Sequence, residues 1–123
     1  MSPDEVRDGI WTIPAARSKN AKQHSVPLGP TALGLVRSFP KQNWSVYKDN
    51  LDKLCGVKDW TLHDLRRTAA TMMAKDLKVP PHILEAILNH ASGTKIARTY
   101  NRADYAEEKR AALEAWDAHV AGL

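Results

Sequence analysis

The sequence predicts a mainly helical α+β fold with one small β-hairpin, and three observations lead to that prediction. Apolar residues recur at helical spacing through most of the second half of the chain. Two short β-prone runs near the beginning flank a polar segment. A length of 123 residues is enough for one modest hydrophobic core, and therefore for a single domain.

The β-prone runs predict a hairpin over about residues 10–28. Residues 10–13 and 24–28 are rich in side chains that favour strands. The polar segment between them is suited to a turn. We expect the tip of this hairpin to be basic, because it contains Arg17, Lys19 and Lys22.

The remaining chain, about residues 30–120, is expected to be helical. Pro30 can begin a short helix, and Pro40 ends it, because proline suits a first helical turn and blocks a helix interior. A second helix is predicted over residues 44–55, and the glycine that follows should terminate it. Its apolar positions are Val46, Tyr47, Leu51, Leu54 and Cys55.

Thr61 and Asp64 predict the start of a third helix, because this spacing forms a capping box. The helix should run to about Leu77, before the interruption at Val79-Pro80-Pro81. Its apolar stripe is expected to comprise Leu65, Ala69, Met72 and Met73.

Pro81 can open a fourth helix that ends near His90. Its apolar face is expected to comprise Ile83, Leu84, Ile87 and Leu88. A turn at Ser92-Gly93 follows, and Asp104 is the candidate cap of a last helix. The last helix should contain Ala106, Lys109, Leu113, Trp116 and Val120.

Charge and cysteine content limit the possible classes of protein. The chain has 18 Lys and Arg against 14 Asp and Glu, and the net charge of +4 favours a polyanionic partner. Cys55 is the only cysteine, which excludes a disulfide framework and a Cys-based zinc site within this sequence. No run approaches the ~18 apolar residues of a membrane span, and the first residues do not form a signal peptide. We therefore expect a cytoplasmic protein with no membrane partner.

Three short motifs carry the candidate chemistry. His63 and Arg66 are three residues apart, so they share one face of the third helix. Leu88-Asn89-His90 ends the fourth helix, and Tyr100-Asn101-Arg102 lies beyond it. Arginine, histidine and lysine can neutralise charge on phosphoryl oxygens and supply a proton to a leaving oxygen without a metal, and a tyrosine oxygen can attack the phosphorus.

Each motif alone also has an ordinary structural explanation. His90 would be stabilised by the dipole at the end of a helix, and Tyr100 could be a core or surface tyrosine. Arg66 could form an ion pair with one of three carboxylates, namely Asp59, Asp64 or Asp76.

In combination, the order and spacing of the motifs resemble the catalytic domain of tyrosine recombinases, the phage integrase family, and especially integrases of prophages and genomic islands. The resemblance extends from about Ile10 to Trp116. It implies an integrase-like catalytic domain that is incomplete on its amino-terminal side, with residues 1–123 as the carboxy-terminal portion. The implied activity is site-specific DNA recombination through tyrosine-mediated strand cleavage and a covalent phosphotyrosyl-DNA intermediate.

The resemblance also implies a role for each candidate residue. Tyr100 would be the nucleophile, and Arg66 and His63 would contact the scissile phosphate. His90 would hydrogen-bond the phosphate or assist proton transfer, and Lys19 would be the general acid. Further contacts to DNA are expected from Arg17, Lys22 and Arg67.

Two of these assignments have competitors nearby in the sequence. Lys22 and Arg17 share the turn with Lys19, so either could replace it. Tyr105 lies close to Tyr100, although the Tyr-Asn-Arg context favours Tyr100.

The partner implied by the resemblance is double-stranded DNA that carries attachment sites. The full-length enzyme is expected to form a tetramer on DNA, in a bacterial cytoplasm, with neither metal nor cofactor. One departure is important: the family requires an arginine in a helix upstream of the hairpin, and Arg7 does not replace it because it immediately precedes the first strand. We therefore expect this chain alone to be inactive.

Three other interpretations of the sequence compete with this one. Residues 68–88 resemble a helix-turn-helix that would place residues 83–90 in a major groove, but those residues offer little to read base edges. A zinc hydrolase using His63, His82 and His90 lacks the spacing of a zinc motif. Type IB topoisomerases share the tyrosine chemistry, but the motifs are closer to those of integrases.

Overall fold

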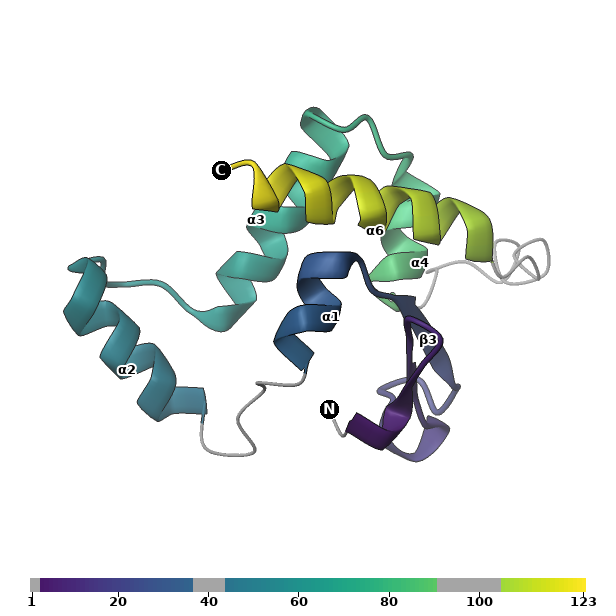
Figure 1. The fold of residues 1–123 in the computed structure, drawn as a ribbon, viewed down its shortest axis with the longest axis horizontal. Coiled ribbons are helices and arrows are strands. Elements are labelled where there is room, and N and C mark those ends of the chain that lie inside the picture. The colour runs from purple at the N-terminus through teal and green to yellow at the C-terminus, as the bar shows by residue number, and fades with distance from the viewer. Residues whose placement is uncertain (1–2, 37–43, 91–104) are drawn as a thin grey trace.

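The computed structural model describes residues 3–36, 44–90 and 105–123. It confirms the predicted α+β class, because helices predominate and a small antiparallel sheet lies at one end (Figure 1). None of the described helices has both the length and the apolar character needed to cross a bilayer.

The predicted hairpin is present, and it belongs to a sheet of three strands. β2 (Ile10–Ile13) pairs with β3 (His24–Pro27), with Ile13 opposite His24. A short strand that the sequence analysis did not predict, β1 (Val6–Arg7), pairs with β2 on its other edge. Asp8 and Gly9 connect β1 to β2 with positive φ angles of 49° and 74°. Asp-Gly is a strong signal for such a two-residue turn.

Five helices are described, and their bounds are close to those predicted. They are α1 (Pro30–Val36), α2 (Trp44–Cys55), α3 (Leu62–Lys75), α4 (Pro81–Ile87) and α6 (Ala106–Ala121). α3 ends at Lys75, two residues before the expected end at Leu77. The expected helix stop at Pro40, the turn at Ser92-Gly93 and the candidate cap Asp104 lie outside the described residues.

The hydrophobic core lies where α3, α4 and α6 meet. Its buried members are Met73, Val79, Ile83 and Ala112. Ile83 is only 2% exposed, which confirms the predicted apolar face of α4. Leu65, by contrast, was expected in the core stripe of α3 and is 55% exposed. The reason is that the buried cluster includes α3 only through Met73 in its second half, so Leu65 near the start of the helix lies outside this cluster.

α2 lies apart from the sheet and from α6 (Figure 1). Its apolar residues have the predicted helical spacing, but they are exposed: Val46, Tyr47, Leu51, Leu54 and Cys55. Helical periodicity therefore predicted the secondary structure of this segment correctly, while the burial of its apolar face does not occur within the described chain.

A long-range cap fixes α1 on α6. The carboxylate of Asp117, in α6, accepts hydrogen bonds from the backbone N–H groups of Thr31 and Ala32 at 3.0 Å each. These groups belong to the first turn of α1 and have no partner within that helix. Gly29 precedes the turn, and a Cβ at this position would overlap the Asp117 side chain. Glycine therefore permits the close approach of the two helices.

The Asp117 cap is expected to stabilise the fold in a pH-dependent way. Burial raises the pKa of Asp117, but the hydrogen bonds from Thr31 and Ala32 outweigh it, so the pKa lies below the ordinary value of 3.8. The stabilisation is therefore present above that value and is lost as the pH falls through the lowered pKa.

We predict that Asp117→Ala lowers the free energy of unfolding by about 1 kcal/mol at neutral pH, the usual effect of losing a helix cap. Urea denaturation checks this. The matched control is Glu114→Ala on the same helix, where an exposed carboxylate contributes less than about 0.5 kcal/mol. Equal destabilisation by both variants, or an Asp117 effect that does not decline as the pH falls through the lowered pKa, would contradict the capping role.

Candidate active site

The beginning of α3 is fixed by the predicted capping box. Thr61 Oγ1 accepts a hydrogen bond from the backbone N–H of Asp64 at 3.3 Å, and Asp64 Oδ2 accepts from the backbone N–H of Thr61 at 2.9 Å. The hydrogen bonds from Thr61 hold the pKa of the Asp64 carboxyl below its usual range. Because the helix begins at Leu62, His63 lies in its first turn and Arg66 one turn later on the same face. Both residues are exposed.

The end of α4 is a Schellman turn, which positions His90. The N–H of His90 donates to the carbonyl of Glu85 at 3.0 Å, and the N–H of Asn89 donates to that of Ala86 at 3.3 Å. Asn89 has a φ of 53°, the left-handed conformation that this turn requires and that asparagine tolerates. The side chain of His90 is therefore presented to solvent immediately beyond the helix.

Side chains from two other elements bond to the next carbonyls of this turn. His24 Nε2, in β3, lies 3.1 Å from the carbonyl oxygen of Ile87. Arg66 Nη2 donates to the carbonyl oxygen of Leu88 at 2.5 Å. The last carbonyls of a helix have no partner within it, and its negative dipole end favours a cation. The arginine thus joins α3 to the residue two positions before His90.

The hairpin tip is joined to the same turn by side-chain amides. Asn20 Nδ2 donates to Asn89 Oδ1 at 2.8 Å, and Asn89 Nδ2 donates to Ser18 Oγ at 3.0 Å. Ser18 Oγ also donates to Asn20 Oδ1 at 2.7 Å. Lys19 lies between Ser18 and Asn20 in the sequence and is exposed. Both neighbours of Lys19 are therefore bonded to the residue that precedes His90.

These contacts bring three of the five predicted catalytic residues to one turn of chain. The segments of Lys19, Arg66 and His90 meet at residues 88–90, and His63 shares the face of Arg66. Tyr100 lies outside the described residues. Arg66 pairs with no carboxylate in ranges 3–36, 44–90 and 105–123, so the alternative of an ion pair with Asp59, Asp64 or Asp76 is not realised there.

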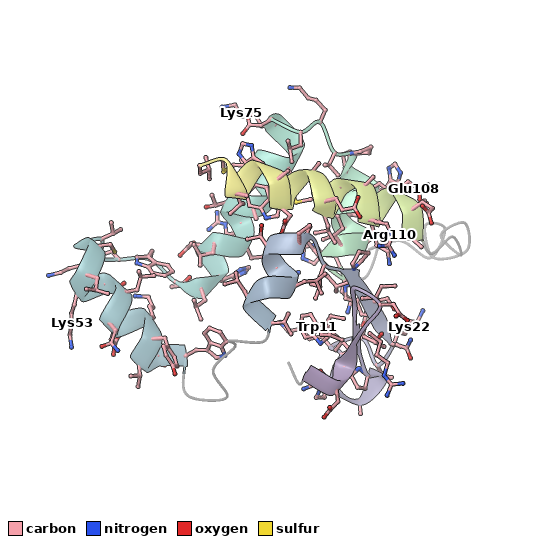
Figure 2. All side chains as sticks on the ribbon, in the orientation of Figure 1. Trp11, Lys22, Lys53, Lys75, Glu108 and Arg110 are labelled. Atoms are coloured by element: carbon pink, nitrogen blue, oxygen red, sulfur yellow. The ribbon has the colours of Figure 1, made fainter. Side chains whose placement is uncertain are left out.

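The three residues predicted to contact DNA differ in their surroundings. Arg17 forms an ion pair with Glu5 at 2.5 Å, and Glu5 also accepts from Trp11 Nε1 at 3.1 Å. Lys22, labelled beside the sheet in Figure 2, is exposed. The side chain of Arg67 is 75% exposed and lies 3.7 Å from Asp64. All three side chains are therefore accessible, but Arg17 and Arg67 each have an anionic partner, Glu5 and Asp64 respectively.

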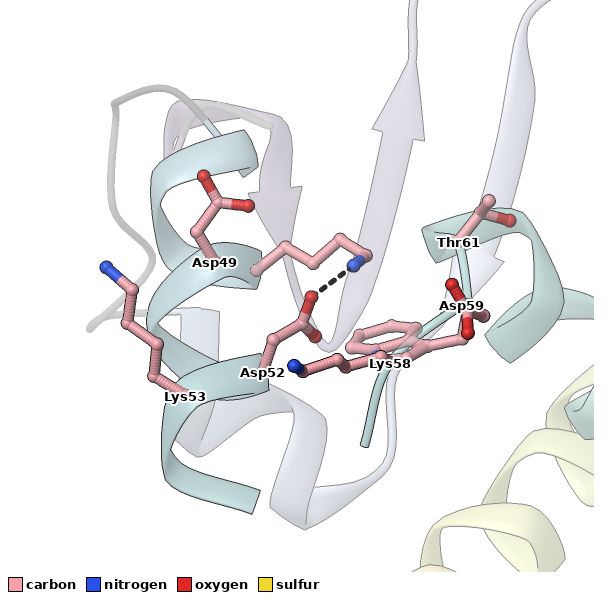
Figure 3. Close-up of a pocket in the computed structure, with 8 residues that line it drawn as sticks. Asp49, Asp52, Lys53, Lys58, Asp59 and Thr61 are labelled. Atoms are coloured by element: carbon pink, nitrogen blue, oxygen red, sulfur yellow. Dashed lines mark hydrogen bonds and ion pairs between the residues drawn. The ribbon is translucent and has the colours of Figure 1, made fainter. Parts of the chain in front are cut away.

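An open cavity of about 800 Å³ lies elsewhere, between α2 and the segment before α3 (Figure 3). Lys48 donates to Asp52 at 2.6 Å inside it and lies 4.7 Å from the ring centroid of Trp60. The other lining residues are Asp49, Lys53, Lys58, Asp59 and Thr61. Its charges are mixed, and it contains none of the predicted catalytic residues. We therefore place the candidate active site at the α4 turn.

The sequence analysis assigned no role to Ser18, Asn20 or Asn89. An asparagine directly after an apolar helical segment is a signal for a left-handed helix end, so the turn at Asn89 was predictable. Its bonds to residues about 70 positions earlier in the chain were not, because no periodicity encodes them. Within the described residues, no three His, Cys, Asp or Glu side chains lie close enough to hold a metal.

Comparison with known proteins supports an integrase relationship. The chain is 32% identical over 86% of its length to prophage integrase IntA of Escherichia coli K12, and it spans 30% of the length of that protein. No protein-family model matches the sequence. No solved structure matches it either. The chain is therefore related to a prophage integrase.

We predict that Thr61→Ala unravels the first turn of α3, because the turn loses its cap. Amide hydrogen exchange of Asp64–Arg66 should become faster, and the free energy of unfolding should fall by about 1 kcal/mol. Thr71→Ala is the matched control, since the Thr71 hydroxyl bonds only to the Arg67 carbonyl within the helix. Unchanged exchange at Asp64 in Thr61→Ala would show that another contact defines the helix start.

Proposed function

We propose that this chain is the carboxy-terminal portion of a tyrosine recombinase that carries out site-specific DNA recombination, as in prophage or genomic-island integration and excision. The observation that carries the proposal is the meeting of Arg66, the hairpin tip and the Leu88-Asn89-His90 turn. Relationship to a prophage integrase supports it independently.

The chemistry requires charge neutralisation on a phosphate and a proton for the leaving group. Arginine offers five N–H donors in a fork that matches phosphate oxygens. Arg66 uses one on the Leu88 carbonyl, which orients the guanidinium while other N–H groups stay available to an anion. The exposed imidazoles of His63 and His90 can add hydrogen bonds to the same phosphate.

In the proposed reaction, the phenolic oxygen of Tyr100 forms a bond to the scissile phosphorus. The bond from phosphorus to the deoxyribose oxygen breaks, and that oxygen takes a proton from Lys19. The phenolic proton passes to His90. The reverse attack by a deoxyribose hydroxyl rejoins the strand, so the phosphotyrosyl bond preserves the energy of the phosphodiester and no nucleotide cofactor is consumed.

The helix-turn-helix alternative fits the structure less well. Ile83, which would have to approach the major groove, is buried against α3 and α6. The exposed residues of α4 include Glu85, whose carboxylate repels phosphate. His82, also exposed, lies against the ring of Tyr105 with centroids 5.3 Å apart. This surface lacks a row of side chains suited to reading base edges.

Recombination by the proposed enzyme also requires parts beyond these 123 residues. By the family pattern, a second arginine clamps the phosphate from an upstream helix, and further domains hold the duplex. The chain by itself should bind DNA weakly, with an affinity that falls steeply as salt is added. Assembly of the whole enzyme into a tetramer on two attachment sites belongs to the same proposal.

We predict that a longer protein, extended upstream to include this arginine, forms a covalent adduct with a suicide duplex nicked beside the attachment-site cleavage point. Tyr100→Phe should abolish the adduct, because phenylalanine has no attacking oxygen. Tyr105→Phe is the matched control and should retain it. The chain alone should form adduct about 10²–10³-fold more slowly, the usual effect of losing one charge-stabilising donor.

Denaturing gels score the adduct, and mass spectrometry of the linked peptide identifies its residue. An adduct formed by the Tyr100→Phe protein would contradict the assignment of the nucleophile. Equal rates for the short and extended proteins would contradict the claim of an incomplete site.

We further predict that Arg66→Ala in the extended protein lowers the cleavage rate at saturating DNA by about 10²–10³-fold. Arg67→Ala, one residue along the same helix, should weaken DNA binding while the saturated rate changes little, because we expect its exposed side chain to contact only a peripheral phosphate. Single-turnover kinetics at several DNA concentrations separate the two effects. A larger loss of saturated rate for Arg67→Ala than for Arg66→Ala would contradict the assigned roles.

A further inference from the structure

We infer that Asn89 is a positioning residue whose carboxamide holds the hairpin tip, and with it Lys19, against the turn that carries His90. The inference deepens the proposed function and rests on it for the role of Lys19 toward phosphate. The juxtaposition itself stands on the hydrogen bonds among Ser18, Asn20 and Asn89.

The geometry of these bonds is reciprocal. Asn89 Oδ1 accepts from Asn20 Nδ2 at 2.8 Å. Asn89 Nδ2 donates to Ser18 Oγ at 3.0 Å and to Asn20 Oδ1 at 3.2 Å. Ser18 and Asn20 are bonded to each other as well. A closed set of three side chains thus fixes the backbone on both sides of Lys19, while the lysine side chain remains exposed.

The other attachment of the tip in the described structure, the ion pair of Arg17 with Glu5, joins it to the amino-terminal segment and not to a helix of the core. Residues 14–17 form one 3₁₀ turn, and the segment from Ser18 to Gln23 contains no strand. The N–H of Ala21 donates to the Ser18 carbonyl, which shapes the tip but does not attach it to another element. The amide bonds to Asn89 are therefore the connection through which the helical part can determine where Lys19 lies.

Asn89 has two separable functions. Its backbone adopts the left-handed conformation of the helix end, and its side chain reaches the hairpin. Glycine adopts a φ of 53° without strain but has no carboxamide. Asn89→Gly therefore preserves the Schellman turn and the position of His90 while it removes only the connection to the hairpin. Asn89→Ala would not separate the backbone function from the side-chain function, because alanine is strained at this φ as well as lacking the carboxamide.

The experiment measures tip order and anion response by NMR in the full 123-residue chain. Without ligand, Asn89→Gly should lower the heteronuclear ¹⁵N NOE of Ser18–Asn20 to values typical of a mobile loop, with amide shifts of α3 unchanged. Asn20→Ala should do the same, and the double variant should add nothing further, because the residues act as a pair. Gln23→Ala, an exposed residue of the same segment, is the matched control and should leave the tip ordered.

Inorganic phosphate is then titrated into the wild type and Asn89→Gly. In the wild type, the Lys19 amide and the Arg66 Nε–H should shift with one common dissociation constant. In Asn89→Gly, the chemical-shift change of the Arg66 Nε–H should remain. The chemical-shift change of the Lys19 amide should fall at least about fivefold, as expected when a donor is no longer preorganised.

Each outcome has a defined meaning. The inference would be overturned if Asn89→Gly has the same ¹⁵N NOE values at Ser18–Asn20 and the same phosphate-induced shift at Lys19 as the wild type. Loss of order at Ser18–Asn20 in Asn89→Gly would support the connection through Asn89. If phosphate then shifts neither the Lys19 nor the Arg66 signal of the wild type, the proposed phosphate site is overturned. Failure of the inference and failure of the proposed function are thus distinguishable.

Discussion

The end of α4 is the constraint on which the candidate site depends. A helix leaves its last carbonyls without internal partners. The Schellman turn at Asn89 satisfies those of Glu85 and Ala86, and side chains from β3 and α3 bond to the next two. The carboxamide of Asn89 adds the hairpin tip. One short helix terminus thereby joins three parts of the chain that are distant in sequence.

Polar contacts position the site because the hydrophobic core is small and lies to one side of it. The buried cluster joins the second half of α3 to α4 and α6, while the start of α3, which carries His63 and Arg66, is exposed. The capping box and the Arg66–Leu88 bond therefore determine where these side chains lie. A site held in this way keeps charged groups accessible to a large anion such as DNA, whereas core packing would bury them.

Local sequence signals predicted most of the fold. Thr61 with Asp64 defined the start of α3, and Pro81 defined that of α4, because caps and prolines act within one turn. The exposure of Leu65 and of the apolar face of α2 was not predictable, since periodicity shows which residues share a face but not whether another element covers it. The order of the short motifs predicted that Arg66, His90 and Lys19 would act together, whereas the amide bonds that join their segments connect residues about 70 positions apart and leave no local pattern.

We propose that Arg66, His90 and Lys19 act together on one phosphate group. A crystal structure of the chain soaked with tungstate, a phosphate mimic, tests it most directly, because the anomalous signal locates the ion without ambiguity. We expect one tungstate ion beside the α4 turn, within hydrogen-bonding distance of Arg66 and His90 and with the Lys19 side chain close to it. Tungstate bound at separate positions by Arg66 and His90, or found only among the lysines of the α2 cavity, would contradict it.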